Sequence, residues 1–238
     1  MPKQAQPSRI VGILGGMGPA ATADFYQKLI LATPATRDQD HLRVVMWADP
    51  TVPNRQEALL HNGADPTPWL EEGVEHILRS GAEIIVVPCN TIHAFLPGVL
   101  EGKSIEFINI IDTTIKAICQ RGPVTKVGLL ATDGALASEV YQAALQAAGI
   151  EPILPSESSQ KTLMKLVYGV KAGEVGPDER EQVGPLLTEL QANGVSTVVV
   201  GCTEISVLLE GLNSEMCIID PSQVLALKTV ERARMCGA

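Results

Sequence analysis

Two segments of this sequence share one pattern, in which an apolar run ends at a cysteine that short polar side chains follow. The run at residues 83–87 leads into Pro88-Cys89-Asn90-Thr91-Ile92-His93, and the run at residues 195–200 leads into Gly201-Cys202-Thr203-Glu204. Short β-branched runs that stop at turn-forming residues are typical of buried strands. We therefore predict two buried strands, each with a thiol directly beyond its carboxyl end.

The shared pattern belongs to a longer internal repeat. A strand-like run that leads into glycine opens the first half at Val11 and the second half at Val127, and Tyr26 matches Tyr141. A short apolar strand that ends in aspartate follows each cysteine at some distance. A duplicated α/β unit with one thiol per copy predicts two lobes that face each other across a cleft.

The position of the two thiols favours a functional role. Ligands of open parallel sheets bind outside the carboxyl ends of the strands, and a following helix offers free N–H groups that favour a thiolate. An isolated cysteine is more often an inert core residue. Because Cys89 and Cys202 occupy matched places in both halves, we favour function.

Composition excludes several classes of protein. A net charge of −9 argues against a surface for nucleic acid or anionic membranes, and no apolar run approaches the length of a membrane span. The five cysteines are odd in number and lack C-x-x-C spacing, which argues against disulfides or a cysteine zinc site. Residues 1–9 lack the apolar core of a secretory signal, so we expect a cytoplasmic protein. The histidines show no ligand-like spacing, and we predict no metal.

Gly15-Gly16-Met17-Gly18-Pro19 forms a predicted turn between a strand at residues 10–14 and a helix that runs to about residue 31. The turn loosely matches the dinucleotide pattern G-x-G-x-x-A through Gly16, Gly18 and Ala21. The next candidate acidic residue, Asp49, lies beyond the usual spacing of about 20 residues. A nucleotide-dependent oxidoreductase therefore stays a minor alternative to a tight turn that faces the cleft.

Periodicity and turn residues predict the other elements. Further strands are expected at residues 42–47, 107–110, 127–131, 150–154 and 216–220, and helices at 69–79, 112–119, 135–148, 160–169, 178–193 and 221–236. Arg55 follows turn-forming residues and should lie on a loop or at a helix start. Lys171, between Gly169 and Gly173, should lie in a turn just past a helix. By residue type alone, both cations would be solvated.

Six segments from about residue 10 to residue 220 carry a resemblance to a known family. They are Gly15-Gly16-Met17-Gly18-Pro19, Pro53-Asn54-Arg55, Pro88-Cys89-Asn90-Thr91-Ile92-His93, Ala131-Thr132-Asp133-Gly134, Gly169-Val170-Lys171-Ala172-Gly173 and Gly201-Cys202-Thr203-Glu204. Together they resemble the cofactor-independent aspartate/glutamate racemases. The Pro-Asn-Arg and Val-Lys-Ala-Gly segments look most like the aspartate racemase branch.

The resemblance implies an α/β fold of two similar Rossmann-like lobes with parallel sheets, related by the internal repeat, with the active site in the cleft between them. Residues 1–101 with 211–238 would form the N-terminal lobe that carries Cys89, and residues 102–210 the C-terminal lobe that carries Cys202. The implied reaction interconverts L- and D-aspartate, with glutamate as a second substrate, in a homodimer without a cofactor.

The resemblance also implies the roles of single residues. Cys89 and Cys202 would remove and return the α-proton on opposite faces of the substrate. The expected substrate-binding residues are Met17, Arg55, Asn90, Thr91, Ile92, Thr132, Lys171 and Thr203. Among these, Arg55 and Lys171 would hold the distal carboxylate of the substrate, which suits the planar fork of an arginine.

Two departures from the glutamate racemase branch leave the partners of the thiols open. Glu204 stands where that branch carries histidine, and the first turn lacks its acidic residue. His93 is at least as well explained by a structural hydrogen bond as by contact with Cys89, and it is given no catalytic role. One alternative function is that of a decarboxylase or a cis–trans isomerase of a dicarboxylic acid. Those reactions need only one thiol, so the presence of two counts against them. A non-catalytic amino-acid-binding protein is a further alternative.

Overall fold

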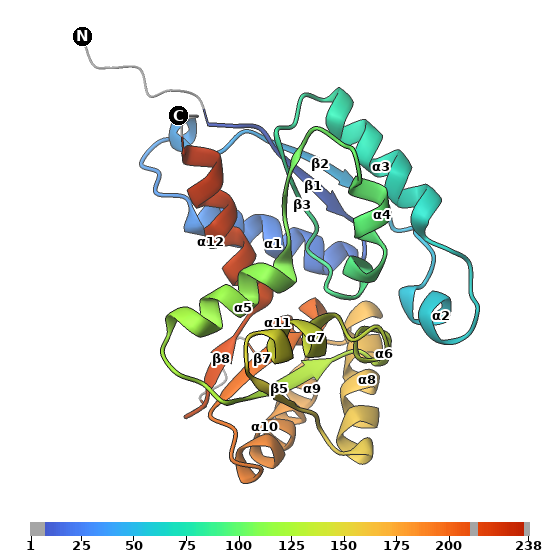
Figure 1. The fold of residues 1–238 in the computed structure, drawn as a ribbon, viewed down its shortest axis with the longest axis vertical. Helices are drawn as coiled ribbons and strands as arrows, with labels where there is room; N and C mark the ends of the chain where they lie inside the picture. The colour runs from blue at the N-terminus through green and yellow to red at the C-terminus, as the bar shows by residue number, and fades with distance from the viewer. Residues whose placement is uncertain (1–7, 210–213, 236–238) are drawn as a thin grey trace.

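The computed structural model describes residues 8–209 and 214–235, which form two four-stranded parallel sheets flanked by helices (Figure 1). The first sheet has the order β2-β1-β3-β4 and contains β1 (Val11–Gly15), β2 (Val44–Ala48), β3 (Ile84–Val86) and β4 (Glu106–Ile108). The second has the order β6-β5-β7-β8 and contains β5 (Lys126–Ala131), β6 (Glu151–Ile153), β7 (Thr197–Gly201) and β8 (Cys217–Ile219). The equivalent strand orders confirm the predicted α/β fold of two similar lobes.

Helices join the strands in both lobes. The first part of the chain contains α1 (Pro19–Ala32), α2 (Arg55–Leu60), α3 (Thr67–Arg79), α4 (Leu96–Leu100), α5 (Ile110–Gln120) and the 3-10 helices η1 (Asp38–Asp40) and η2 (Thr91–Ala94). The second contains α6 (Asp133–Ala137), α7 (Val140–Ala147), α8 (Glu157–Lys171), α9 (Pro177–Glu181), α10 (Val183–Ala192), α11 (Thr203–Leu208) and α12 (Pro221–Arg234). None of the helices in this described part of the chain is both long and apolar enough to cross a membrane.

Three helical predictions differ from the structure. The helix expected at residues 135–148 is divided into α6 and α7, because Glu139 between them has a positive φ of 55°. The helix expected at residues 178–193 is likewise divided, at Gln182. Lys171 lies on the last turn of α8 rather than past it, because the left-handed residue that follows the helix is Gly173 and not Gly169.

Sheet pairing divides the chain differently from the sequence-based boundaries. β4 pairs with β3 and belongs to the first sheet, although it falls within residues 102–210. β8 pairs with β7 in the second sheet, although it falls within residues 211–238. A parallel crossover returns the chain to its own sheet, so the strand that follows each cysteine stays in that cysteine's lobe. The last helix, α12, does return to the first lobe, where it packs on α1 and α5 (Figure 1).

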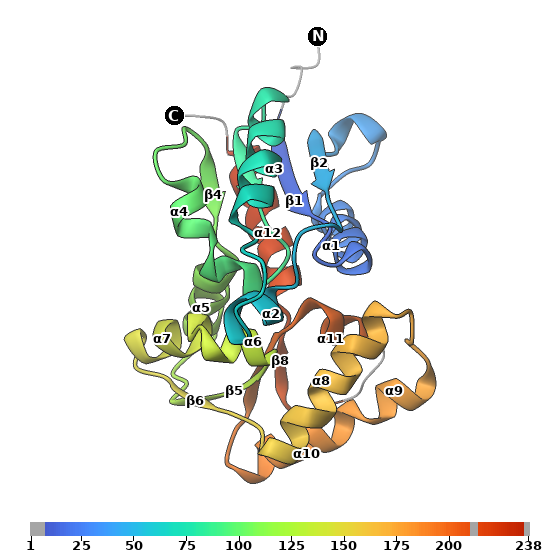
Figure 2. The same cartoon turned by 90° about the vertical axis from the view of Figure 1, so that its right-hand side faces the viewer.

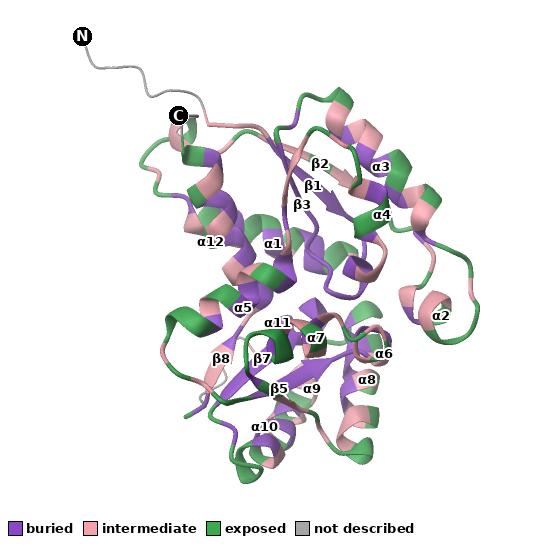
Figure 3. Cartoon of the chain, in the orientation of Figure 1, coloured by how far each residue is buried: buried purple, intermediate pink, exposed green. Residues whose placement is uncertain are grey.

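The central strands of both sheets are buried, as Figure 3 shows for β1, β3, β5 and β7. One apolar cluster spans the two lobes and includes Phe25 and Leu225 together with Leu129 and Tyr141. Two further clusters lie one within each lobe. Elsewhere the lobes meet through short helices, among which α2 and α6 lie next to each other (Figure 2). The residues that follow the carboxyl ends of β3 and β7 meet between the lobes, where Cys89 and Cys202 line one pocket.

Candidate active site

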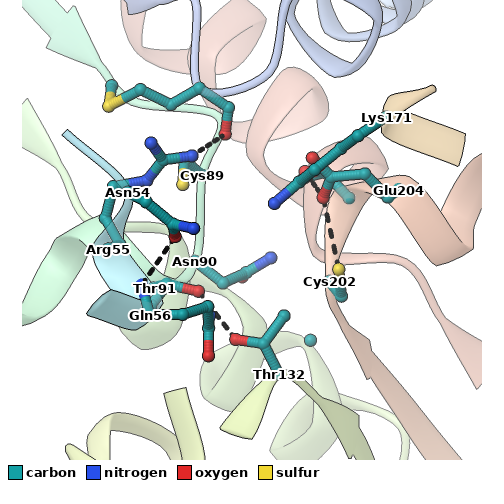
Figure 4. Close-up of a pocket in the computed structure, with 13 residues that line it drawn as sticks. Asn54, Arg55, Gln56, Cys89, Asn90, Thr91, Thr132, Lys171, Cys202 and Glu204 are labelled. Carbon is teal, nitrogen blue, oxygen red and sulfur yellow. Dashed lines mark hydrogen bonds between the residues drawn. The ribbon is translucent and has the colours of Figure 1, made fainter. Parts of the chain in front are cut away.

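A small pocket between the lobes contains both predicted thiols (Figure 4). Its lining residues are Met17, Asn54, Arg55, Gln56, Cys89, Asn90, Thr91, Thr132, Lys171, Gly201, Cys202, Thr203 and Glu204. The enclosed volume is about 20 Å³, which is room for about one water molecule. A hollow of about 720 Å³ beside α5 and α12 is much larger but contains neither thiol, so volume alone would not identify this site.

The pocket brings together nearly all of the residues predicted from the sequence. The exception is Ile92, whose side chain is fully buried in the apolar core of the first lobe and does not line the pocket. Asn54 and Gln56 line it without having been predicted, although both flank Arg55 in the sequence. Glu204 also lines it, and the sequence had left its role open.

Cys89 lies beyond the carboxyl end of β3, two residues before η2 begins, and is 7% exposed. Burial raises the pKa of its thiol above the ordinary value. The nearby Arg55 guanidinium, the backbone N–H of Ile92 and the Lys171 ammonium act in the opposite direction, whereas Glu204 adds to the increase in pKa. Among the charged groups near the first thiol, the Arg55 guanidinium therefore has the largest effect on its pKa.

His93 forms a hydrogen bond with the backbone of Cys89 and not with its sulfur. Its Nδ1 donates to the carbonyl of Cys89 at 2.8 Å, and its Nε2 accepts from the N–H of Ile110 at 3.4 Å. Burial lowers the pKa of His93 to about 4. It is thus a neutral, structural histidine that connects the Cys89 loop to the start of α5.

Cys202 lies at the N-cap of α11 and is paired with a carboxylate. Its thiol donates to Oε2 of Glu204 at 3.2 Å, and the hydroxyl of Thr203 donates to the same oxygen at 3.3 Å. Burial raises the pKa of Cys202 well above the ordinary value, Glu204 raises it further, and Lys171 lowers it. The backbone N–H of Glu204, in the first turn of α11, lowers the pKa of Cys202 as expected for a helix N-terminus, but burial outweighs this effect.

Two cations reach the pocket from opposite lobes. Arg55 begins α2, and its guanidinium donates to the carbonyls of Val52 at 3.3 Å, Pro53 at 3.1 Å and Met17 at 3.3 Å. These bonds hold the guanidinium at the pocket while leaving other N–H groups free to bind a ligand. Figure 4 shows the ammonium of Lys171 pointing from the end of α8 into the space between Cys89 and Glu204.

Polar contacts join the lobes around the pocket. Oγ1 of Thr91 lies 2.9 Å from Oγ1 of Thr132, and the backbone N–H of Gly134 donates to Oε1 of Gln56. The hydroxyl of Tyr141 donates to Oδ1 of Asn90 at 2.6 Å. Nδ2 of Asn90 is buried and has no hydrogen-bond partner among the described residues.

The site thus offers two thiols from opposite lobes, two cations, one carboxylate and several uncharged donors. Figure 4 shows Cys89 and Cys202 on opposite sides of the pocket. This arrangement can bind a small molecule with two anionic groups and present a proton-transferring thiol to each of its faces. No group of three or more His, Cys, Asp or Glu side chains within residues 8–209 and 214–235 is arranged to hold a metal ion.

The chain is similar to known racemases in sequence and in fold. The family model for Asp/Glu/Hydantoin racemase matches residues 14–229. The broad specificity amino-acid racemase RacX of Bacillus subtilis is 27% identical over 228 residues, which cover 93% of this chain and 96% of that protein. The structure of Picrophilus torridus aspartate racemase superposes with a TM-score of 0.84 at 32% identity, over 94% of each chain. Glutamate racemase from Francisella tularensis shares the fold, with a TM-score of 0.68 at 18% identity over 94% of this chain and 80% of that one.

Proposed function

Because this chain belongs to the Asp/Glu/Hydantoin racemase family, and is therefore an isomerase, we propose that it interconverts L- and D-aspartate by proton transfer between Cys89 and Cys202. The observation that carries the proposal is the pair of thiols, which lie at equivalent strand ends of the two lobes and on opposite sides of one pocket. The likeness to an aspartate racemase at 32% identity supports aspartate as the substrate. The broad specificity of RacX makes other amino acids, including glutamate, the alternative.

In the proposed reaction, one cysteine acts as a thiolate and the other as a thiol. The thiolate takes the α-hydrogen as a proton, and the electron pair of that C–H bond stays on the substrate as a planar carbanion. The opposite thiol then gives its proton to the other face of the α-carbon and becomes the thiolate. Each turnover exchanges the protonation states of Cys89 and Cys202, so each cysteine is the base for one enantiomer.

The neighbouring cations partly offset the effect of burial on the two thiols. Arg55 and Lys171 lower the pKa of Cys89, and Lys171 lowers that of Cys202. A second thiolate would add a further negative charge beside Glu204 and is disfavoured. The site therefore suits the single-thiolate state that two-base racemisation needs.

The carbanion needs donors at its α-carboxylate, onto which its charge spreads. The hydroxyls of Thr91, Thr132 and Thr203 line the pocket, and Nδ2 of Asn90 is a buried donor without a partner among the described residues. We assign these four side chains to the α-carboxylate, for which the hydroxyl of Thr203 exchanges its bond to Glu204 for one to the substrate. We assign Arg55 and Lys171 to the distal carboxylate. No step of this mechanism uses a cofactor.

Entry of the substrate requires the lobes to separate. A dicarboxylic amino acid is several times larger than a water molecule, whereas the enclosed volume is about 20 Å³. The bonds of Gln56 with Gly134 and of Thr91 with Thr132 cross the pocket region and would break or lengthen on opening.

We propose that the protein acts as a cytoplasmic homodimer, as the family resemblance implies. The two pocket cysteines form no disulfide, which suits a reducing compartment.

Replacement of each thiol tests the proposal. Cys89→Ala and Cys202→Ala should each lower the racemisation of L- and D-aspartate by a factor of about 100 or more, because each removes one of the two proton-transfer groups. Chiral chromatography of the incubated amino acid measures the rate, and circular dichroism checks the fold. The control is Cys119→Ala, which changes an exposed thiol and should keep full activity. Near-full activity of either pocket variant would remove that cysteine from the mechanism.

A further inference from the structure

We infer that Glu204 binds the α-ammonium group of the substrate and thereby restricts the site to amino acids. The inference rests on the proposed function and names the substrate group that this carboxylate recognises. Glu204 is only 7% exposed and lies on α11, next to Cys202. Its Oε2 already accepts hydrogen bonds from Cys202 and Thr203.

The other oxygen of this carboxylate is the reason for the inference. Oε1 of Glu204 is buried, and among the described residues it has no hydrogen-bond partner. It lies 3.5 Å from the point that a Cβ on Gly18 would occupy, so it faces a residue of the turn after β1 that has no side chain to pair with it. A buried carboxylate oxygen without a donor costs free energy, and an ammonium group supplies charged N–H donors.

The charges that line the pocket match an amino acid with two carboxylates. The lining residues include two cations, Arg55 and Lys171, and one carboxylate, Glu204. Aspartate has the complementary set, with two carboxylates and one ammonium group. A dicarboxylic acid without an amino group would leave Oε1 of Glu204 unpaired and would bring its own negative charge close to it. Glu204 therefore disfavours the binding of dicarboxylic acids that lack an amino group, which the alternative decarboxylase or cis–trans isomerase would use.

Figure 4 places Glu204 beside Lys171 and above Cys202, at the second-lobe side of the pocket. An ammonium group bound there leaves the two carboxylates of the substrate to Arg55, Lys171 and the donors near Asn90. The competing explanation is that Glu204 serves only as the hydrogen-bond acceptor for the Cys202 thiol. The two explanations differ in what they predict for binding, since only the first one requires the amino group of the ligand.

The experiment compares the binding of DL-aspartate with that of succinate, which is aspartate without its amino group. Isothermal titration calorimetry measures both ligands on the unmodified protein, and the racemic ligand avoids any net conversion during titration. We expect aspartate to bind at least about tenfold more tightly than succinate. Glu204→Gln should weaken aspartate binding by about 10- to 100-fold. Its affinity for succinate should be higher than that of the unmodified protein or lower by no more than about threefold.

Two further variants complete the test. Glu57→Gln removes an exposed carboxylate from α2, the helix that Arg55 begins, and should leave both affinities unchanged. Glu204→Asp keeps the charge and should retain a preference for aspartate, which guards against misfolding of Glu204→Gln. An unchanged ratio of the two affinities in Glu204→Gln would overturn the inference, even if racemisation fell.

The outcome also separates this inference from the proposed racemisation. If the unmodified protein did not racemise aspartate but preferred it to succinate through Glu204, the proposed function would fail and the inference would stand. If the unmodified protein racemised aspartate, but Glu204→Gln preferred aspartate over succinate to the same degree as the unmodified protein, only the inference would fail. Equal binding of aspartate and succinate by the unmodified protein would overturn the inference whatever the activity.

Discussion

At the scale of single residues, the local backbone around Arg55 orients a side chain that is usually solvated so that it can bind a ligand. The side chain of Asn54 caps α2 by accepting from the N–H of Gln56 at 2.9 Å, so the helix begins at Arg55. Three backbone carbonyls then orient the guanidinium toward the pocket. An arginine side chain that is already held in this way loses less conformational entropy when it binds a ligand than a solvated arginine would lose.

Arg55→Ala should lower kcat/KM for aspartate by about tenfold to a few hundredfold, because a charged hydrogen bond contributes about 1.5–3 kcal/mol. Alanine has no distal carboxylate, so it should be a poor substrate of the unmodified protein. The kcat/KM for alanine should therefore fall little further in Arg55→Ala. Chiral chromatography with both amino acids measures the difference, and Arg37→Ala, which changes a cation paired with Asp40 and not at the pocket, is the control. Equal losses for aspartate and alanine would indicate a folding defect and remove Arg55 from substrate selection.

At the scale of the elements, His93 connects η2 to α5 and makes that connection sensitive to pH. The folded protein holds the pKa of His93 at about 4, against about 6.5 for a histidine in an unfolded chain. Between these values the unfolded state binds a proton that the folded state does not, so stability falls as the pH falls from about 7 toward 4. Both ring nitrogens are engaged only in the neutral form, since the protonated ring cannot accept from Ile110.

We expect this histidine to account for a loss of about 2 kcal/mol in the free energy of unfolding between pH 7.5 and pH 5. His93→Gln, whose side chain does not titrate, should remove about that much of the pH dependence, although it should be less stable at pH 7.5. Urea denaturation at the two pH values measures the change. His61→Gln replaces an exposed histidine and should keep the dependence of the unmodified protein. An equal pH dependence in His93→Gln would show that the buried histidine is not responsible.

At the scale of the whole molecule, the two halves share a fold but differ in how they meet. Tyr26 and Tyr141 occupy matching places in the repeat, yet Tyr26 is 39% exposed and Tyr141 is fully buried. The hydroxyl of Tyr141 crosses from the second lobe to the Asn90 side chain of the first. The repeat is therefore symmetric in topology and asymmetric in contacts, and the contacts between the lobes orient a residue of the pocket.

Tyr141→Phe should lower the free energy of unfolding by about 1–3 kcal/mol, because it leaves Oδ1 of Asn90 without its buried donor. Tyr26→Phe makes the same chemical change at the matching position of the repeat and should alter stability by no more than about 0.5 kcal/mol. Denaturant unfolding of both variants gives the comparison. Similar effects of the two substitutions would contradict the assignment of Tyr141 as a contact between the lobes.

Much of the fold and of the pocket could be predicted from the sequence. The repeated strand-and-cysteine pattern indicated buried strands in two similar α/β lobes, because short β-branched runs that end at turn residues are typical of buried strands. The parallel pairing of those strands was implied by the family resemblance. The same pattern led to Cys89 and Cys202 in one pocket, because ligand-facing residues follow the carboxyl ends of such strands. These features depend on neighbours along the chain, and a local pattern can specify them.

Only the tertiary structure decided the rest. It assigned β4 and β8 to their sheets and brought Gln56 and Glu204 into the pocket. It also gave Cys202 a carboxylate partner, whereas Arg55 is the charged group with the largest effect on Cys89. It also raised the pKa of both thiols, because burial outweighs the backbone N–H groups that favour the thiolate. Burial and electrostatic partners depend on segments that are distant in the sequence, and the packing of two lobes against each other sets them.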